Sequence, residues 1–266
     1  MKKIILEKID TNAPKNITKE EALKKIEEMK LEIIDLQKIF YASWKKSILI
    51  VLQWMDTSWK DWVVKKVLAW VNPLGIRVSA FWKPSEEEYS HDFLWRLHKE
   101  APRRWMIRVF NRSYYEDVLV PSVEWFLDKD RVEKRYKHIK NYEEMLNDEG
   151  TIILKFFLHM SKKKQKERLL ERITLERKFW KYDPSDTKAR ENWDDYMKAY
   201  EKVFEKTDSD FAPWYIVPTD QKWYKVYFIT KVLLETLRGL NLQWPKLKNH
   251  PWLKCNKDWK CKIKKN

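Results

Sequence analysis

The segment Trp54–Trp62 holds the residues whose types and spacing most directly suggest chemistry. If its three tryptophans were glycines, it would carry the GxxxxGK spacing of a loop that wraps phosphate groups between a strand and a helix. Lys60 then takes the lysine position of that loop. Asp61 departs from the pattern, because a serine or threonine usually follows the lysine and contacts the metal ion. As printed, the segment matches no phosphate-binding motif.

The tryptophans are the obstacle to this chemistry. A phosphate loop turns its backbone N–H groups toward the ligand, so it needs residues that tolerate positive φ and place no Cβ in the way. Indoles at Trp54, Trp59 and Trp62 would fill the space that the phosphates need. Either these residues form an aromatic cluster packed under a helix, or they stand where the functional loop requires glycine.

Composition bears on that choice. The chain of 266 residues contains 3 glycines and 16 tryptophans. An average glycine content of ~7% predicts roughly 19 glycines, which equals the sum of the glycine and tryptophan counts. The 44% hydrophobic content is enough for a packed core and argues against disorder. The length suits one or two domains of ~150 residues each.

Other candidate sites are weak. Cys255 and Cys261 lie in a basic tail, at a spacing that fits neither a redox CxxC pair nor a zinc knuckle. We therefore expect reduced thiols without a catalytic role. The histidines show none of the paired spacings of zinc enzymes; they are His91, His98, His138, His159 and His250.

Two kinds of pattern predict the elements that position the segment. Thr18 and Glu21 fit a capping box. The apolar residues after it recur at spacings of three and four and predict a long amphipathic helix; they are Ala22, Ile26, Met29, Ile33, Leu36 and Phe40. Short apolar runs typical of buried strands alternate with helical stretches; they are Ser47–Gln53, Ile76–Phe81, Met106–Phe110, Thr151–Leu158 and Trp214–Val217. This alternation predicts an α/β fold with a mostly parallel sheet covered by helices on both faces.

We expect an N-terminal helical extension over 1–45, a core over 46–240 and a lysine-rich tail over 241–266. Within the core, about 161–200 is a very polar helical stretch interrupted at Tyr182–Pro184. This stretch fits either a mobile lid or a plain solvent-facing excursion. Ligands of parallel sheets bind beyond the carboxyl ends of the strands, and Trp54–Trp62 follows the first strand.

Charge and hydropathy limit the partners. Lys and Arg number 55 against 40 Asp and Glu, a net charge of +15, which favours an acidic partner. No apolar run approaches the ~20 residues of a membrane span, and the N-terminus offers only a short apolar stretch as a signal core. We therefore expect a cytoplasmic protein.

Several blocks of residues, in order, carry a resemblance to a known family. They are Leu52–Asp61, Val71–Pro73, Pro84–Glu88, His91–Arg96, Phe110–Asp117, Gly150–Leu158, Trp193–Tyr196, Ala212–Tyr215 and Lys222–Tyr224. Over about 33–240 the chain resembles the family-2 polyphosphate kinases. The resemblance implies a P-loop kinase-like three-layer fold with a helical lid. It also implies direct, Mg²⁺-dependent phosphoryl transfer between inorganic polyphosphate and a nucleotide such as AMP, ADP or GDP.

The resemblance separates the tryptophans into two groups. One group stands where the family also has tryptophan: Trp95, Trp180, Trp193, Trp214 and Trp223. The other stands where the family has glycine: Trp54, Trp59, Trp62, Trp70 and Trp105, to which we add Trp44, Trp82 and Trp125. Our hypothesis is that UGA codons meant as glycine have been translated as tryptophan. The chain as printed would then be impaired in phosphate binding.

The resemblance also assigns roles in the phosphate loop. Lys60 would hold phosphate oxygens, and Asp56 would coordinate Mg²⁺. The other loop residues are Trp54, Met55, Thr57, Ser58, Trp59, Asp61 and Trp62. From the residues alone, Lys60 could equally be a solvated lysine at a helix start, and Asp56 an Asx turn or helix cap.

A second motif and a lid residue complete the expected site. The motif residues are Asn111, Arg112, Ser113, Glu116 and Asp117. Arg112 offers a planar fork for the transferred phosphate. Some family members carry aspartate at the position of Asn111, so metal ligation here could fall to Glu116 or Asp117. Arg172 matches a lid arginine that closes on the phosphates, although it could equally pair with Glu171 or Glu176 on the surface.

Family relatives suggest a homo-oligomer, a dimer or a tetramer. Two other functions stay open. One is an ATP-dependent nucleoside monophosphate kinase. The other is a catalytically dead, basic nucleic-acid-binding relative, which the absence of an RNP motif disfavours.

Overall fold

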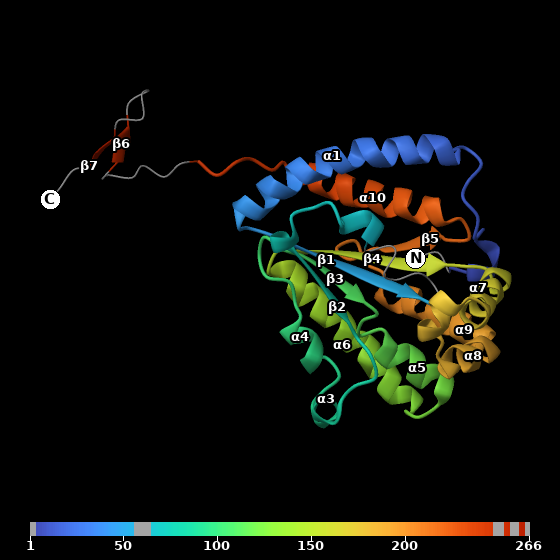
Figure 1. Ribbon diagram of the computed structural model, residues 1–266. Helices are drawn as coiled ribbons and strands as arrows, with labels where there is room; N and C mark the ends of the chain where they lie inside the picture. Colours follow the sequence, from blue (N-terminus) through green and yellow to red (C-terminus); the bar gives the residue numbers. More distant parts are fainter. Residues whose placement is uncertain (1–3, 56–64, 247–252, 256–260, 264–266) are drawn as a thin grey trace.

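The computed structural model describes residues 4–55, 65–246, 253–255 and 261–263 and has an α/β fold. Five parallel strands form one sheet in the order β2-β3-β1-β4-β5 (Figure 1). They are β1 (Ser47–Trp54), β2 (Ile76–Ala80), β3 (Ile107–Asn111), β4 (Thr151–His159) and β5 (Trp214–Pro218). Each strand coincides with an apolar run that predicted one, so the expected fold class is confirmed.

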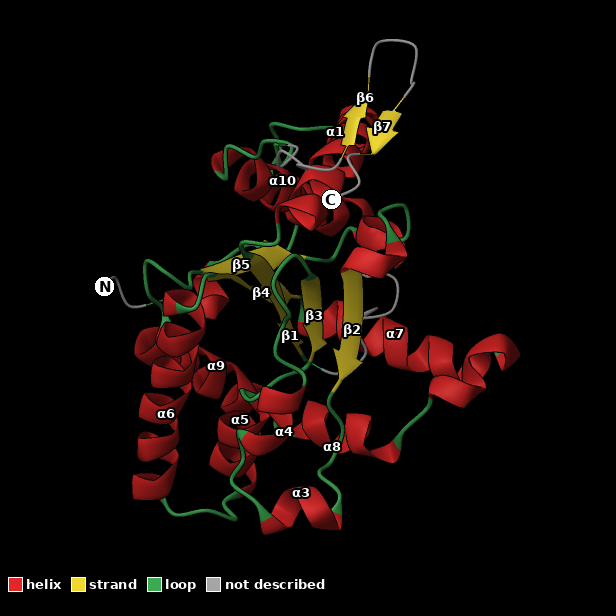
Figure 2. Ribbon diagram, turned by 90° about the vertical axis from the view of Figure 1, so that its left-hand side faces the viewer, coloured by secondary structure: helices red, strands yellow, loops and turns green. Residues whose placement is uncertain are grey.

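Helices cover both faces of this sheet (Figures 1 and 2). On one face lie α1 (Lys19–Ser43) and α10 (Lys222–Gly239), which pack side by side. On the other lie α5 (Glu116–Glu124), α6 (Lys129–Asp148) and α9 (Trp193–Thr207). Shorter elements connect them: η1 (Leu6–Lys8), η2 (Pro73–Gly75), α3 (Glu86–Ser90) and α4 (Trp95–Lys99). A small antiparallel hairpin of β6 (Leu253–Cys255) and β7 (Cys261–Ile263) follows α10.

The central strand β1 explains why both faces are covered. Its side chains alternate between two apolar clusters, as the period of two in a strand requires. Leu49 and Val51 join the cluster with α5, α6 and α9. Ile48, Ile50 and Leu52 join the cluster with α1 and α10. The strand order reverses at β1, so its carboxyl end is the place where a sheet of this type binds ligands.

The predicted capping box starts α1. The Thr18 hydroxyl accepts a hydrogen bond from the Glu21 N–H at 3.2 Å, and the Thr18 N–H donates to the Glu21 carboxylate at 2.9 Å. The inner face of α1 packs against α10 and buries the residues that the periodicity predicted; those fully buried are Ala22, Ile26, Ile33 and Phe40. The predicted long amphipathic helix is therefore present as α1.

The polar stretch after β4 has two parts. The first contains α7 (Lys162–Thr174), η3 (Glu176–Lys181) and α8 (Pro184–Glu191), with the break at the expected Tyr182–Pro184. These elements are mostly exposed. The second part is α9, whose inner face is buried in the core through Tyr200, Val203 and Phe204. A movement of the polar segment would therefore leave α9 in place.

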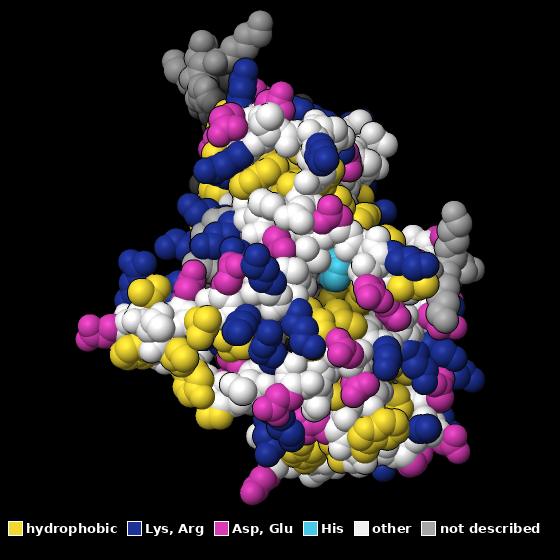
Figure 3. All heavy atoms as spheres, turned by 90° about the vertical axis from the view of Figure 1, so that its right-hand side faces the viewer, with side chains coloured by type: hydrophobic (Ala, Val, Ile, Leu, Met, Phe, Trp, Pro, Cys, Tyr) yellow, Lys and Arg dark blue, Asp and Glu magenta, His cyan; other side chains and the backbone are white. Residues whose placement is uncertain are grey.

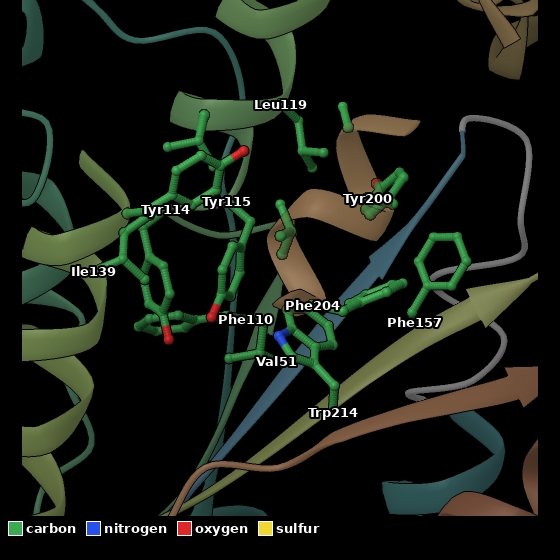
Figure 4. Packing of buried hydrophobic residues seen from close by; sticks show 14 of the residues in the cluster. Val51, Phe110, Tyr114, Tyr115, Leu119, Ile139, Phe157, Tyr200, Phe204 and Trp214 are labelled. Carbon is green, nitrogen blue, oxygen red and sulfur yellow. The ribbon is translucent and has the colours of Figure 1, made fainter. Parts of the chain in front are cut away.

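A buried polar network lies at the centre of the cluster under α5, α6 and α9, among the aromatic side chains of Figure 4. The Lys155 ammonium on β4 donates to the Glu143 carboxylate of α6 at 2.7 Å, and both side chains are fully buried. Glu143 also accepts from the Tyr114 and Tyr115 hydroxyls, each at 2.7 Å. Lys155 donates in addition to the Thr207 carbonyl at 2.7 Å. The network thus joins β4, α6, α9 and the turn after β3.

Removing one member of this network should destabilise the fold strongly. We expect Glu143→Ala to lower the free energy of unfolding by about 3–5 kcal/mol, because it leaves the Lys155 charge buried without its counter-ion. Glu144→Ala, one position along α6 at an exposed residue, should change it by less than about 0.5 kcal/mol. Urea unfolding of both variants measures the difference. Equal losses for the two variants would contradict the central role of the pair.

Candidate functional site

The candidate site lies at the carboxyl end of β1. Trp54 ends the strand, and its carbonyl accepts a hydrogen bond from the Tyr200 hydroxyl of α9 at 2.8 Å. Met55, the next residue, is also buried. The remaining predicted loop residues lie outside the described residues; they are Asp56, Thr57, Ser58, Trp59, Lys60, Asp61 and Trp62. The structure thus shows how the start of the loop is anchored, and the roles of Asp56 and Lys60 stay predictions.

The second motif lies directly beside the end of β1. The Arg112 N–H donates to the Leu52 carbonyl at 3.2 Å, and the Asn111 carbonyl accepts from the Phe81 N–H at 3.1 Å. Arg112 has a φ of +60°, in the left-handed region. This conformation costs on the order of 1 kcal/mol for a residue with a Cβ, and it persists where the surrounding structure enforces it. The motif is therefore held rigidly between β1 and the residue after β2.

Two oxygen atoms at this place have no hydrogen-bond partner among the described residues. They are Asn111 Oδ1 and Gln53 Oε1, and both side chains are buried. The amide nitrogen of Gln53 donates to the Glu116 carboxylate at 3.1 Å. Buried amide oxygens normally have a partner, so these two are suited to a group that the described part of the chain does not supply. No three His, Cys, Asp or Glu side chains gather as a metal site among the described residues, here or elsewhere.

Asp117 has a different environment from the other motif residues. Its carboxylate lies 3.5 Å from the Arg96 guanidinium, and Arg96 also donates to the Trp82 carbonyl at 2.8 Å. Burial raises the pKa of Asp117, although Arg96 and Arg135 act in the opposite direction. Ser113 is fully buried, and its hydroxyl accepts from the Tyr115 N–H at 3.3 Å. Asp117 and Ser113 therefore position the turn after β3.

The predicted lid arginine has a partner that the sequence did not suggest. Arg172 on α7 forms an ion pair with Asp186 on α8 and donates to the Lys181 carbonyl at 2.9 Å. The surface alternatives were Glu171 and Glu176; of these, Glu171 pairs with Lys178 instead. Arg172 thus links α7 to α8 in this structure.

A second arginine on α7 is the more unusual residue. Arg168 is 4% exposed, and its Nη2 donates to the Thr219 carbonyl at 3.1 Å. Its Nε and Nη1 atoms have no hydrogen-bond partner among the described residues. Burial lowers the pKa of Arg168, and the carboxylates of Asp220, Glu171 and Glu167 offset this only in part.

A second buried cation lies near Arg168, beside the carboxyl end of β5. Lys225, in the first turn of α10, is fully buried. Its pKa is lowered well below the ordinary value by burial and then by the charges of Arg168 and Lys222. Lys and Arg side chains also gather on the face of the molecule toward which β1 and β4 run (Figure 3). Buried like charges at one place are costly unless an anion offsets them.

Sequence reasoning missed several of these residues. Arg168 lies one helical turn before Arg172, and this i, i+4 spacing on a polar helix was the available signal. Lys155 could have been noticed as a lysine within a buried strand, because such a charge needs a partner. Lys225 and Glu143 left no such signal, since both occur in ordinary amphipathic helical patterns.

Comparisons with known proteins agree with this geometry. The family model of Polyphosphate kinase 2 matches residues 16–244. The chain is 43% identical over 227 residues to an AMP/ADP-polyphosphate phosphotransferase of Meiothermus ruber, covering 85% of each chain. It is also 43% identical over 224 residues to an ADP-polyphosphate phosphotransferase of Rhodopseudomonas palustris, covering 79% of this chain and 77% of that one.

A solved structure extends the likeness to the fold. The crystal structure of Polyphosphate Kinase 2 from Arthrobacter aurescens TC1 superimposes with a TM-score of 0.90 at 38% identity, over 94% of this chain and 90% of that one. Sequence, fold and the order of the motifs around β1 therefore lead to one assignment. The chain belongs to the polyphosphate kinase 2 family.

Proposed function

We propose that this protein transfers a phosphoryl group between inorganic polyphosphate and AMP or ADP. The observation that carries the proposal is Arg168, a buried guanidinium beside the end of β5, with two nitrogens that have no hydrogen-bond partner among the described residues. A bound polyanion would supply acceptors for these nitrogens. The activities for which the two relatives are named support this choice of donor and acceptor.

The residues act by positioning and by neutralising charge. Phosphoryl transfer passes through a loose transition state and asks for little covalent participation by the protein. Lys60 and Arg112 would hold the transferred group, the latter through the planar fork of its guanidinium. Arg168 and Lys225 would bind neighbouring phosphates of the polyphosphate chain. The attacking phosphate oxygen of AMP or ADP is already anionic at neutral pH, so no general base is needed.

The residues present fit a divalent cation, which we propose to be Mg²⁺. This ion prefers oxygen ligands and few protein carboxylates. Asp56 would supply the carboxylate, and Asn111 Oδ1, which has no hydrogen-bond partner among the described residues, would supply a second oxygen. Glu116, bonded to Gln53, is a further candidate. When bound, Mg²⁺ would neutralise phosphate charge that Lys60 and the arginines leave unbalanced.

We further propose that part of 161–200 acts as the lid of a core over 46–240. The moving part would be 161–191, because α9 is packed in the core. The ion pair between Arg172 and Asp186 would keep α7 and α8 together, and closure on substrate would exclude water from the reaction.

Other expectations stay predictions. No helix in the described part of the chain is long and apolar enough to cross a membrane. The cytoplasmic location, the homo-oligomeric state, the N-terminal extension over 1–45, the tail over 241–266 and the use of GDP rest on the sequence argument alone.

The identity of the phosphoryl donor, polyphosphate or ATP, distinguishes the two candidate functions. Two versions of the protein should be compared, one with tryptophan and one with glycine at positions 54, 59 and 62. Each is assayed with AMP and with ADP as acceptor, and with polyphosphate or ATP as donor. We expect Mg²⁺-dependent ADP or ATP formation from polyphosphate, with the glycine form the more active. Phosphorylation of AMP by ATP, with none from polyphosphate in either form, would refute the proposal in favour of a nucleoside monophosphate kinase.

Arg168→Gln should weaken substrate binding without unfolding the protein. Loss of one charge-assisted hydrogen bond, about 1.5–3 kcal/mol, should raise the KM for polyphosphate about 10- to 100-fold. The free energy of unfolding should change by no more than about 1 kcal/mol, because a buried like charge is removed as well. Lys166→Gln makes the same charge change at an exposed position of α7 and is the control. An unchanged KM for polyphosphate in Arg168→Gln would count against the assignment.

Arg112→Gly should separate activity from stability. Glycine relieves the left-handed backbone, so the free energy of unfolding should stay equal or rise by about 1 kcal/mol. The catalytic rate should fall about 10²- to 10³-fold, because a charged group on the transferred phosphate is lost. Arg112→Lys keeps the backbone strain and the charge but loses the planar fork. Its catalytic rate should lie between that of the unchanged protein and that of Arg112→Gly. Near-normal turnover by Arg112→Gly would contradict the role of this arginine.

A further inference from the structure

Three tryptophans have a backbone conformation that their side chains disfavour. The φ angles of Trp44, Trp105 and Trp125 are 57°, 67° and 56°. Among the described residues other than glycine, only Arg112 and Asn241 share a positive φ. Asparagine tolerates this region, whereas for bulky residues it is an outlier.

Two of the three lie at the C-terminal cap of a helix, a position at which glycine is favoured. Trp44 is the left-handed cap after α1, and Trp125 is the left-handed cap after α5, with its N–H bonded to the Pro121 carbonyl at 3.1 Å. Glycine is the usual residue at such a helix end because it lacks a Cβ. Trp105 lies in the tight connection before β3, where its N–H donates to the Lys46 carbonyl at 2.6 Å.

The side-chain contacts of these tryptophans contribute little stabilisation to offset the backbone strain. Trp44 is 60% exposed and Trp125 is 69% exposed. Trp44 stacks on Trp105 at 4.0 Å between ring centroids, which pairs two strained residues with each other. Trp125 lies near the Lys129 ammonium at 5.4 Å, a surface contact of small energy.

The tryptophans that match tryptophan in the family behave differently. None of them has a positive φ in the described structure. Trp193 and Trp214 are buried, and the Trp214 indole donates to the Thr207 hydroxyl at 3.0 Å. The three tryptophans with a left-handed backbone thus all belong to the group that stands where the family has glycine, and none belongs to the group that the family shares.

We propose that the natural protein carries glycine at positions 44, 105 and 125, and that UGA codons read as glycine in the source cell are the cause. The same reading extends to positions 54, 59, 62 and 70, where the sequence pattern calls for glycine. It accounts for part of the imbalance between 3 glycines and 16 tryptophans. It also removes the indoles from the phosphate loop. The proposal does not depend on the enzymatic activity.

The gene and the natural protein provide the direct test. We expect UGA at codons 44, 54, 59, 62, 70, 105 and 125, and UGG at the tryptophans that the family shares; these are Trp95, Trp180, Trp193, Trp214 and Trp223. Peptide mass spectrometry of protein from the source cell should find glycine at the first set. UGG codons at 44, 105 and 125, or indole-containing peptides there, would overturn the proposal.

A stability measurement tests the structural reasoning separately. Trp125→Gly should raise the Tm by ~2–4 °C, because it relieves a left-handed backbone and removes an exposed indole. The matched control is Trp180→Gly, since Trp180 is 74% exposed but lies in η3 without a positive φ. There the Tm should stay equal or fall, as glycine only adds freedom to the unfolded chain. A fall in Tm for Trp125→Gly as large as for Trp180→Gly would overturn the argument from backbone geometry.

Discussion

The buried ion pair between Lys155 and Glu143 is the interaction on which the site depends. Taking both charges out of water is costly, and only the dense hydrogen bonding around them makes the pair tolerable. Tyr114 and Tyr115 supply two of those bonds, and these tyrosines lie within the second motif, between Ser113 and Glu116. The core therefore positions Arg112: the turn cannot relax without breaking hydrogen bonds to a buried charge. A cluster that looks purely structural holds a strained residue in place.

The site itself is unfavourable in the free protein. Arg112 has a left-handed backbone, and Arg168 and Lys225 place positive charge in a buried environment. Such costs persist only when the rest of the fold compensates for them. A polyanionic substrate would relieve the charge repulsion on binding.

Much of the fold could be predicted from local patterns. The apolar runs located all five strands, since strands buried on both faces are recognisable by their continuous apolar residues. The capping box located the start of α1. The partner of Arg172 could not be predicted, because Asp186 reaches it only through the turn at Tyr182–Pro184. Arg168 lies in a polar helix and Lys225 in an amphipathic one, and their burial emerges only in the folded chain.

By itself, the sequence determined the α/β class, the order of the motifs, the family and the anomaly of its tryptophans. Each of these follows from the types of residues and their spacing along the chain. The tertiary structure decided which charges are buried together, which carboxylates hold arginines in place and which tryptophans have a left-handed backbone. These properties depend on contacts between residues far apart in the chain, as between Glu143 and Trp214 through Thr207 and Lys155. Burial and backbone strain arise only when such contacts form, so no local pattern carries them.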